Sequence, residues 1–263
     1  MITPGLVSVT FRNLDVASVV SLAAEAGLAS IEWGADVHVP VGDTGAAAVA
    51  RKLCAEAGLE ISSYGSYYRA DTDVGEFESV VTTAVALGAP SIRVWAGRVG
   101  SDDASPEQRE AVARTVADAT ELAAGHGVGI SLEYHPGTLT DTVPSALAVL
   151  ADVSSRRTDK GYPVRLYYQP FRGTPADESV RAVRALLEAG HLSNVHVFSW
   201  GADGTRLPLA DRDDLWRPVL ADLAASERRH HAQLEFVAGD DPSRFHADAA
   251  TLQAWIRELG EAP

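Results

Sequence analysis

Eight short apolar segments, rich in Val, Ile and aromatic residues, alternate along the 263-residue chain with longer segments of helical periodicity. Strands that alternate with helices pair in parallel, because each helix returns the chain to the same edge of the sheet. The expected strands are 6–11, 30–33, 60–64, 91–95, 128–133, 164–169, 194–199 and 233–237. The expected helices are 15–27, 44–57, 74–87, 105–124, 143–151, 177–189, 213–226 and 242–259.

Eight strand–helix units predict a (β/α)8 TIM barrel of the α/β class, a single domain over residues 1–263, because this fold typically takes about 250 residues. The alternative is an open, doubly wound sheet. That fold places a glycine-rich phosphate-binding turn after its first strand, whereas VSVTFRNLD has no glycine after Gly5. The polar stretch Ser154 to Gly161 is expected to be an exposed connection.

Composition excludes several classes of function. The 36 Asp and Glu residues outnumber the 22 Lys and Arg residues, and the resulting net charge of -14 disfavours nucleic acid as a partner. A lone cysteine, Cys54, allows no disulfide within the chain and lies in an Ala-rich helical pattern, where a buried thiol is expected. With neither a signal-like start nor a long apolar run, we expect a cytoplasmic protein without membrane contact.

Polar side chains stand at the ends of four successive predicted strands, where the active sites of such barrels lie. These residues are Glu133, Gln169, His196 and Glu235. A lone His or Glu is more often a satisfied core residue, but four such residues together favour a metal site. Two carboxylates, an amide oxygen and an imidazole suit Mn²⁺ or Mg²⁺, with Co²⁺ or Zn²⁺ possible.

Other residues near the strand ends are candidates for substrate contact. Glu133 and His135 are two residues apart, so both side chains should point to one side of the strand. Arg93 lies inside a strand and needs a carboxylate partner, for which Glu32 and Glu133 are the obvious candidates. The expected substrate-binding set is Glu32, His38, Tyr64, Arg93, Trp95, His135, Arg172, Trp200 and Arg206. The alternatives are a surface turn for Glu32 and His38, and core packing for Tyr64.

Four segments resemble the xylose-isomerase-like barrels that include sugar phosphate isomerases and epimerases. They are residues 26–40, 131–142, 194–200 and 233–237. The resemblance implies a divalent metal bound by Glu, Asp, His and Glu on the fifth to eighth strands. Glu133, His196 and Glu235 match that pattern, whereas Gln169 stands where Asp is usual and implies a weaker site. Arg172 replaces a histidine that the sugar epimerases carry.

The resemblance implies a metal-dependent isomerase or epimerase of a sugar, keto-sugar or cyclitol, working through an enediolate. Glu133 and Glu235 would then accept and return the proton next to the carbonyl. A lyase of the same fold, such as a dehydratase or a C-glycoside eliminase, needs the same metal and base. A DNA-repair endonuclease is disfavoured by the charge, and a non-catalytic sugar-binding barrel remains an alternative. Family members are often dimers or tetramers, so a homo-oligomer is possible.

Overall fold

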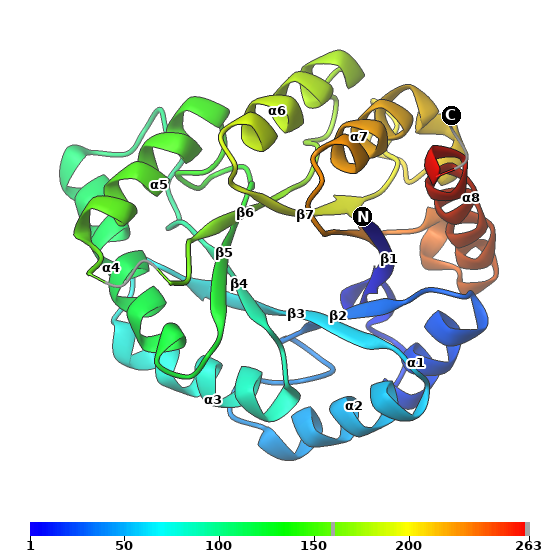
Figure 1. The fold of residues 1–263 in the computed structure, drawn as a ribbon, viewed down its shortest axis with the longest axis horizontal. Coiled ribbons are helices and arrows are strands. Elements are labelled where there is room, and N and C mark those ends of the chain that lie inside the picture. Colours follow the sequence, from blue (N-terminus) through cyan, green and yellow to red (C-terminus); the bar gives the residue numbers. More distant parts are fainter. Residues whose placement is uncertain (159–160, 261–263) are drawn as a thin grey trace.

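Eight parallel strands close a barrel in the order β1-β2-β3-β4-β5-β6-β7-β8, and β1 pairs with both β2 and β8. Helices surround this ring, one after each strand (Figure 1). The computed structural model describes residues 1–158 and 161–260. The prediction of a single-domain (β/α)8 barrel is confirmed.

The strands are short and the helices longer. The strands are β1 Ile2–Val7, β2 Ser30–Gly34, β3 Glu60–Arg69, β4 Ser91–Trp95, β5 Gly129–Glu133, β6 Arg165–Tyr168, β7 Leu192–Val197 and β8 His230–Leu234. The α-helices are α1 Val16–Glu25, α2 Thr44–Glu56, α3 Phe77–Leu87, α4 Pro106–Ala124, α5 Val143–Arg156, α6 Ala176–Glu188, α7 Asp213–Ala225 and α8 Pro242–Gly260.

Two predicted strands are wrong in position. The first strand begins at Ile2 and ends at Val7, after which residues 8–11 form a 3-10 turn. Gly5 belongs to this strand because it pairs with Ser30 and Gln233, and a Cβ there would lie only 2.3 Å from the Ser30 hydroxyl oxygen. The last strand ends at Leu234, and Phe236 has a φ of 57°, so an extended strand cannot continue through it.

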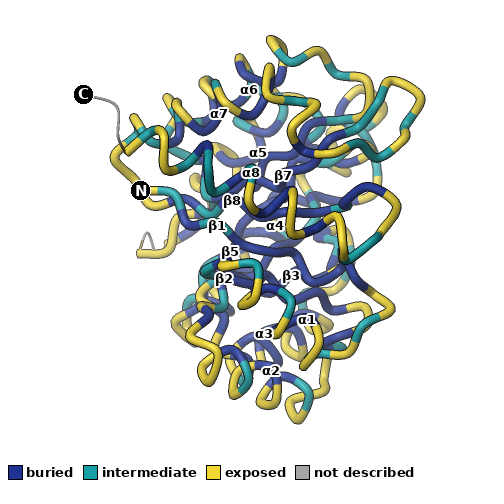
Figure 2. The backbone as a smooth tube through the Cα atoms, turned by 90° about the vertical axis from the view of Figure 1, so that its right-hand side faces the viewer, coloured by how far each residue is buried: buried dark blue, intermediate teal, exposed yellow. Residues whose placement is uncertain are grey.

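The hydrophobic core lies between the barrel and its helices, where the strands are buried and the outer helix faces are exposed (Figure 2). Helix starts follow the sequence signals: the hydroxyl of Ser105 caps α4 in a capping box with Gln108. Cys54 is buried on the inner side of α2, as expected. In the described part of the chain, no helix is long and apolar enough to cross a membrane.

Helix α5 is longer than expected and reaches Arg156. Ser154 to Arg156 are exposed, as expected, but they belong to this helix and not to a connection. Arg157 is buried, and residues 159–160 of the expected connection lie outside the described residues.

Candidate active site

The four predicted metal-site residues come together at the carboxyl ends of β5 to β8. Glu133 ends β5 and His196 lies near the end of β7, while Gln169 and Glu235 directly follow β6 and β8. His196 Nδ1 lies 3.6 Å from Glu133 Oε1 and 3.5 Å from Glu235 Oε2. Gln169 Nε2 donates a hydrogen bond of 3.0 Å to Glu133 Oε1. The arrangement follows from the parallel barrel, which brings all strand ends to one edge.

A buried ion-pair network lies beneath these residues. Arg93 Nε donates to Glu32 Oε1 at 2.9 Å, and the same guanidinium contacts Glu133. Glu32 Oε2 accepts a 2.8 Å hydrogen bond from the Ser63 hydroxyl and lies 3.3 Å from His196 Nε2. The predicted need of Arg93 for a carboxylate partner is therefore confirmed for both candidates.

Charge in this network is unbalanced. Three buried carboxylates, Glu32, Glu133 and Glu235, face one permanent cation, Arg93. Burial raises the pKa of Glu235 to about 7 against the opposing charge of His196. For His196, burial would lower the pKa, but the charges of Glu32 and Glu235 outweigh it and raise the pKa to about 9. A further positive charge at this point would therefore be stabilised.

Two atoms at the centre of the site have no hydrogen-bond partner although they are buried. They are Nδ1 of His196 and Oε2 of Glu235. Their separation of 3.5 Å is close to the roughly 3.0–3.4 Å between two ligands of one ion bound at about 2.1 Å. In the described part of the chain, no three His, Cys, Asp or Glu side chains already form a metal-ligating arrangement. The donor types and separations nevertheless fit a divalent cation, because Glu133 Oε1 faces His196 while its Oε2 is contacted by Arg93 and Trp95.

Above this centre, the mouth of the barrel is aromatic. The Trp95 indole N–H donates to Glu133 Oε2, and its ring stacks on His135 with 4.7 Å between centroids. Glu133 and His135 thus face the same side, as predicted, while Tyr134 packs on Tyr168 and Phe171. A cavity of about 530 Å³ opens here. Its lining residues are His135, Pro136, Gln169, Pro170, Phe171, Arg172, Phe198, Trp200, Arg206 and Phe236.

Three of the expected substrate contacts lie elsewhere. Tyr64 is fully buried outside the barrel, where its hydroxyl donates to the Val39 carbonyl at 2.8 Å, so the core-packing alternative is correct. His38 is also buried and its Nε2 lies 3.0 Å from the Leu14 carbonyl oxygen. Glu32 is not on a surface turn but inside the barrel, where its two oxygens are occupied by Arg93, Ser63 and His196.

The sequence interpretation missed Arg69. This residue ends β3, and its guanidinium lies 3.9 Å from the centre of the Trp95 ring. The predicted strand stopped at residue 64, so Arg69 was not counted as a strand end. Tyr64, Tyr67 and Tyr68 in the run SSYGSYYR have the β propensity that signals a longer strand.

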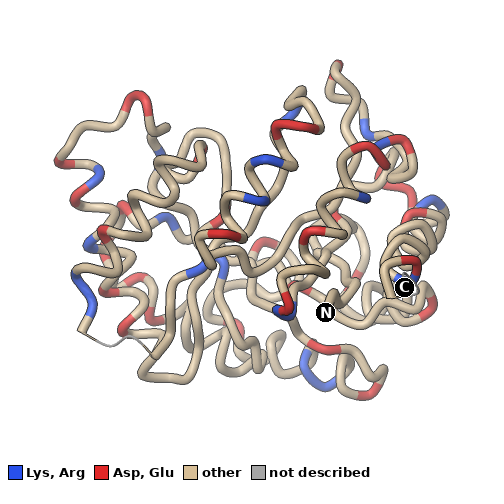
Figure 3. Tube along the Cα trace, turned by 45° about the horizontal axis from the view of Figure 1, so that its top comes forward, with Lys and Arg blue, Asp and Glu red and all other residues tan. Residues whose placement is uncertain are grey.

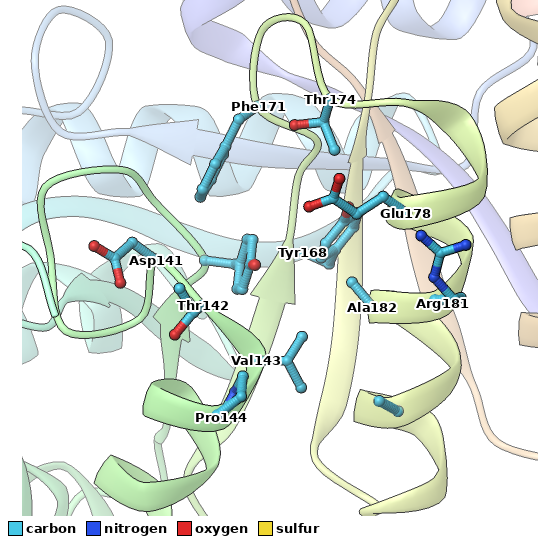
Figure 4. Close-up of a pocket in the computed structure, with 12 residues that line it drawn as sticks. Asp141, Thr142, Val143, Pro144, Tyr168, Phe171, Thr174, Glu178, Arg181 and Ala182 are labelled. Atoms are coloured by element: carbon cyan, nitrogen blue, oxygen red, sulfur yellow. The ribbon is translucent and has the colours of Figure 1, made fainter. Parts of the chain in front are cut away.

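A second hollow, of about 430 Å³, lies on the outer side of the barrel between α5 and α6. Figure 4 shows Phe171 and Thr174 at one end of it, with Glu178 and Arg181 on α6. Phe171 and Tyr134 separate it from the mouth, and none of the predicted metal-site residues lines it. The candidate active site is therefore the cavity at the barrel mouth.

Comparison with known proteins gives the family. A family model described as xylose isomerase-like TIM barrel matches residues 20–206. The chain belongs to this family. A curated 3-dehydroshikimate dehydratase from Bacillus anthracis is 27% identical over 176 residues, which cover 61% of each chain.

Solved structures with the same fold include enzymes of two kinds. The probable 3-DHS dehydratase of Bacillus anthracis has a TM-score of 0.77 at 21% identity, covering 96% of this chain and 99% of its own. An L-ribulose 3-epimerase has a TM-score of 0.74 at 16% identity, covering 99% and 96%. A D-allulose 3-epimerase from Methylomonas sp. has a TM-score of 0.67 at 16% identity, covering 96% and 97%.

Proposed function

We propose that this protein is a divalent-metal-dependent enzyme that moves a proton at the carbon next to a carbonyl of a sugar, keto-sugar or cyclitol, as an isomerase or epimerase. The observation that carries the proposal is the convergence of Glu133, His196 and Glu235 around two unpartnered buried atoms. The epimerases among the structural relatives are consistent with it.

Glu133, His196, Glu235 and Gln169 would hold the metal, with Gln169 rotated so that its carbonyl oxygen faces the ion. When bound, a divalent ion would act as a Lewis acid that polarises the substrate carbonyl. The two carboxylates differ in their surroundings. Glu133 Oε2 accepts from Arg93 and Trp95, whereas Glu235 Oε2 has no hydrogen-bond partner. Glu235 is therefore the better proton acceptor, because the oxygen of Glu133 that faces Arg93 and Trp95 already accepts hydrogen bonds.

Elimination is the second candidate, and two observations favour it. A two-base epimerisation needs both carboxylates to exchange protons, and the Arg93 and Trp95 donors on Glu133 Oε2 oppose that. The curated relative is a dehydratase. In this reaction Glu235 would take the proton next to the carbonyl, the C–H electrons would form a C=C bond, and the hydroxyl on the next carbon would leave as water with the proton that Glu235 returns.

Metal analysis tests the site first. We expect about one equivalent of a divalent ion, Mn²⁺ foremost, in the purified protein and less in Glu235→Gln. Glu178→Gln, on the outer face of α6, is the matched control and should keep the parent's content. A parent that binds no metal after incubation with Mn²⁺ would refute the proposal.

Incubation in deuterated water separates the two reactions. The substrates to screen are keto-sugars, cyclitols and 3-dehydroshikimate. Deuterium in the recovered substrate or its isomer would support isomerisation or epimerisation, whereas an unsaturated product with loss of water would support elimination. Neither outcome with any of these compounds would count against both reactions.

A further inference from the structure

We infer that the mouth selects a substrate carrying an anionic group, a carboxylate or a phosphate, which Arg172 binds on the face of Trp200. This inference rests on the proposed function, because it places the carbonyl end of the substrate at Glu235 and the anionic end at the rim. It further restricts the substrate class, since a neutral ketose or cyclitol offers no such group.

The residues that line the mouth cavity are cationic in an acidic protein, although carboxylates lie beneath them. The chain has a net charge of -14, and its charged residues are spread over the outer helices and loops (Figure 3). Yet the described lining of the cavity includes two arginines, Arg172 and Arg206, and neither Asp nor Glu. A local excess of positive charge against the overall charge raises the local concentration of anions.

Trp200 lies on a hairpin and forms the platform on which both arginines stack. Residues 199–207 form a short hairpin, in which Leu207 N donates to Ser199 O at 3.0 Å and Trp200 bridges to Arg206. The guanidinium carbons of Arg172 and Arg206 lie 4.3 Å and 5.3 Å from the centre of the Trp200 ring. Stacking on an indole fixes the plane of a guanidinium but leaves its N–H groups free to bind a ligand.

The two arginines differ in what neutralises them. Arg206 forms an ion pair with Asp240, on the turn that follows β8. Arg172 has no carboxylate partner among the described residues and is exposed at the rim. Its charge is therefore available to a ligand, and Arg206 mainly supports the platform.

Binding of matched probes tests this inference. The probes are shikimate, its uncharged methyl ester and inorganic phosphate, titrated calorimetrically into the chelated protein and into the protein loaded with Mn²⁺. We expect the parent to bind shikimate about tenfold more tightly than the ester, as for one charged hydrogen-bond pair. Arg172→Gln should lose this preference. Arg217→Gln should keep it, because Arg217 stacks on Trp255 in the same way but on the outer helices.

Each outcome decides the inference. Equal affinity of the parent for acid and ester, an unchanged preference in Arg172→Gln, or no binding of shikimate or phosphate at millimolar concentration would overturn it. Competition by phosphate that depends on Arg172 would support a phosphorylated substrate, and its absence a carboxylate. Loss of the preference in Arg172→Gln with no metal in the parent would retain the anion site and refute the proposed chemistry. Metal binding by the parent together with an unchanged preference in Arg172→Gln would refute the anion site and retain the proposed chemistry.

Discussion

Replacing Arg93 by Met tests the buried network most directly. The guanidinium is 3% exposed and contacts both Glu32 and Glu133. Removing it leaves two carboxylates in the barrel without their cation, and breaking a buried ion pair in this way costs about 3–5 kcal/mol. At about 2.1 cal/mol/K per residue, the 263 residues have an unfolding entropy of about 0.55 kcal/mol/K. The melting temperature should therefore fall by about 5–9 °C.

The measurement is thermal unfolding of metal-free protein by circular dichroism, with Arg184→Met as the matched control. Arg184 pairs with Asp222 at 2.7 Å, but its side chain is 54% exposed, so its loss should cost at most about 1 kcal/mol. Replacing Glu32 by Met in the Arg93→Met background should recover part of the stability, because one unpaired charge disappears. A single variant that melts within about 2 °C of the parent, or a double variant that recovers nothing, would refute this reasoning.

Three further predictions follow. Gly65→Ala should destabilise by about 1–3 kcal/mol in urea unfolding, because its Cβ would lie 2.7 Å from Arg93 Nη2, whereas Gly129→Ala, with no neighbour closer than 3.7 Å, should cost less. Gln169→Asp should tighten Mn²⁺ binding in equilibrium dialysis by supplying a charged ligand, and unchanged affinity would contradict the assignment. Burial lowers the pKa of His231 from 6.5 to about 4, so the folded chain binds fewer protons. The contribution of His231 to the free energy of unfolding should then fall by about 3 kcal/mol from pH 6.5 to 4. His231→Gln should lose less, and an equal loss would disprove the role of this residue.

The architecture was predictable because each strand–helix unit has its own local signals. Glycines after helices and caps such as Ser105 divide the chain into units whose number and order leave few alternatives to a closed barrel. The positions of the first and last strands were not predictable in this way. Pro4 and Gly5 are typical of a turn in isolation, and only pairing with β8 and the close approach to Ser30 keep them in β1.

The metal-site residues were easier to predict than the residues that surround the cavity. Glu133, His196 and Glu235 converge because parallel strand ends must meet at one edge of the barrel, so their order along the chain was enough. The direction of a side chain depends in addition on register. β3 has an irregular register against β2 between Ile31 and Glu32, and it places Tyr64 outside the barrel. Such irregularities arise from pairing between distant segments and have no local signature.

Glu133 and Glu235 occupy equivalent strand-end positions in the sequence but have unequal surroundings in the folded chain, and this inequality bears on the reaction. Glu133 Oε2 accepts hydrogen bonds from Arg93 and Trp95. Oε2 of Glu235 has no hydrogen-bond partner. Under the proposed function, Glu235→Gln should therefore abolish deuterium exchange at the substrate carbon. Trp95→Phe, which removes one donor from Glu133, should make Glu133 a better proton carrier and raise any epimerisation relative to elimination. A product ratio unchanged in Trp95→Phe would mean that these hydrogen bonds do not decide between the two reactions.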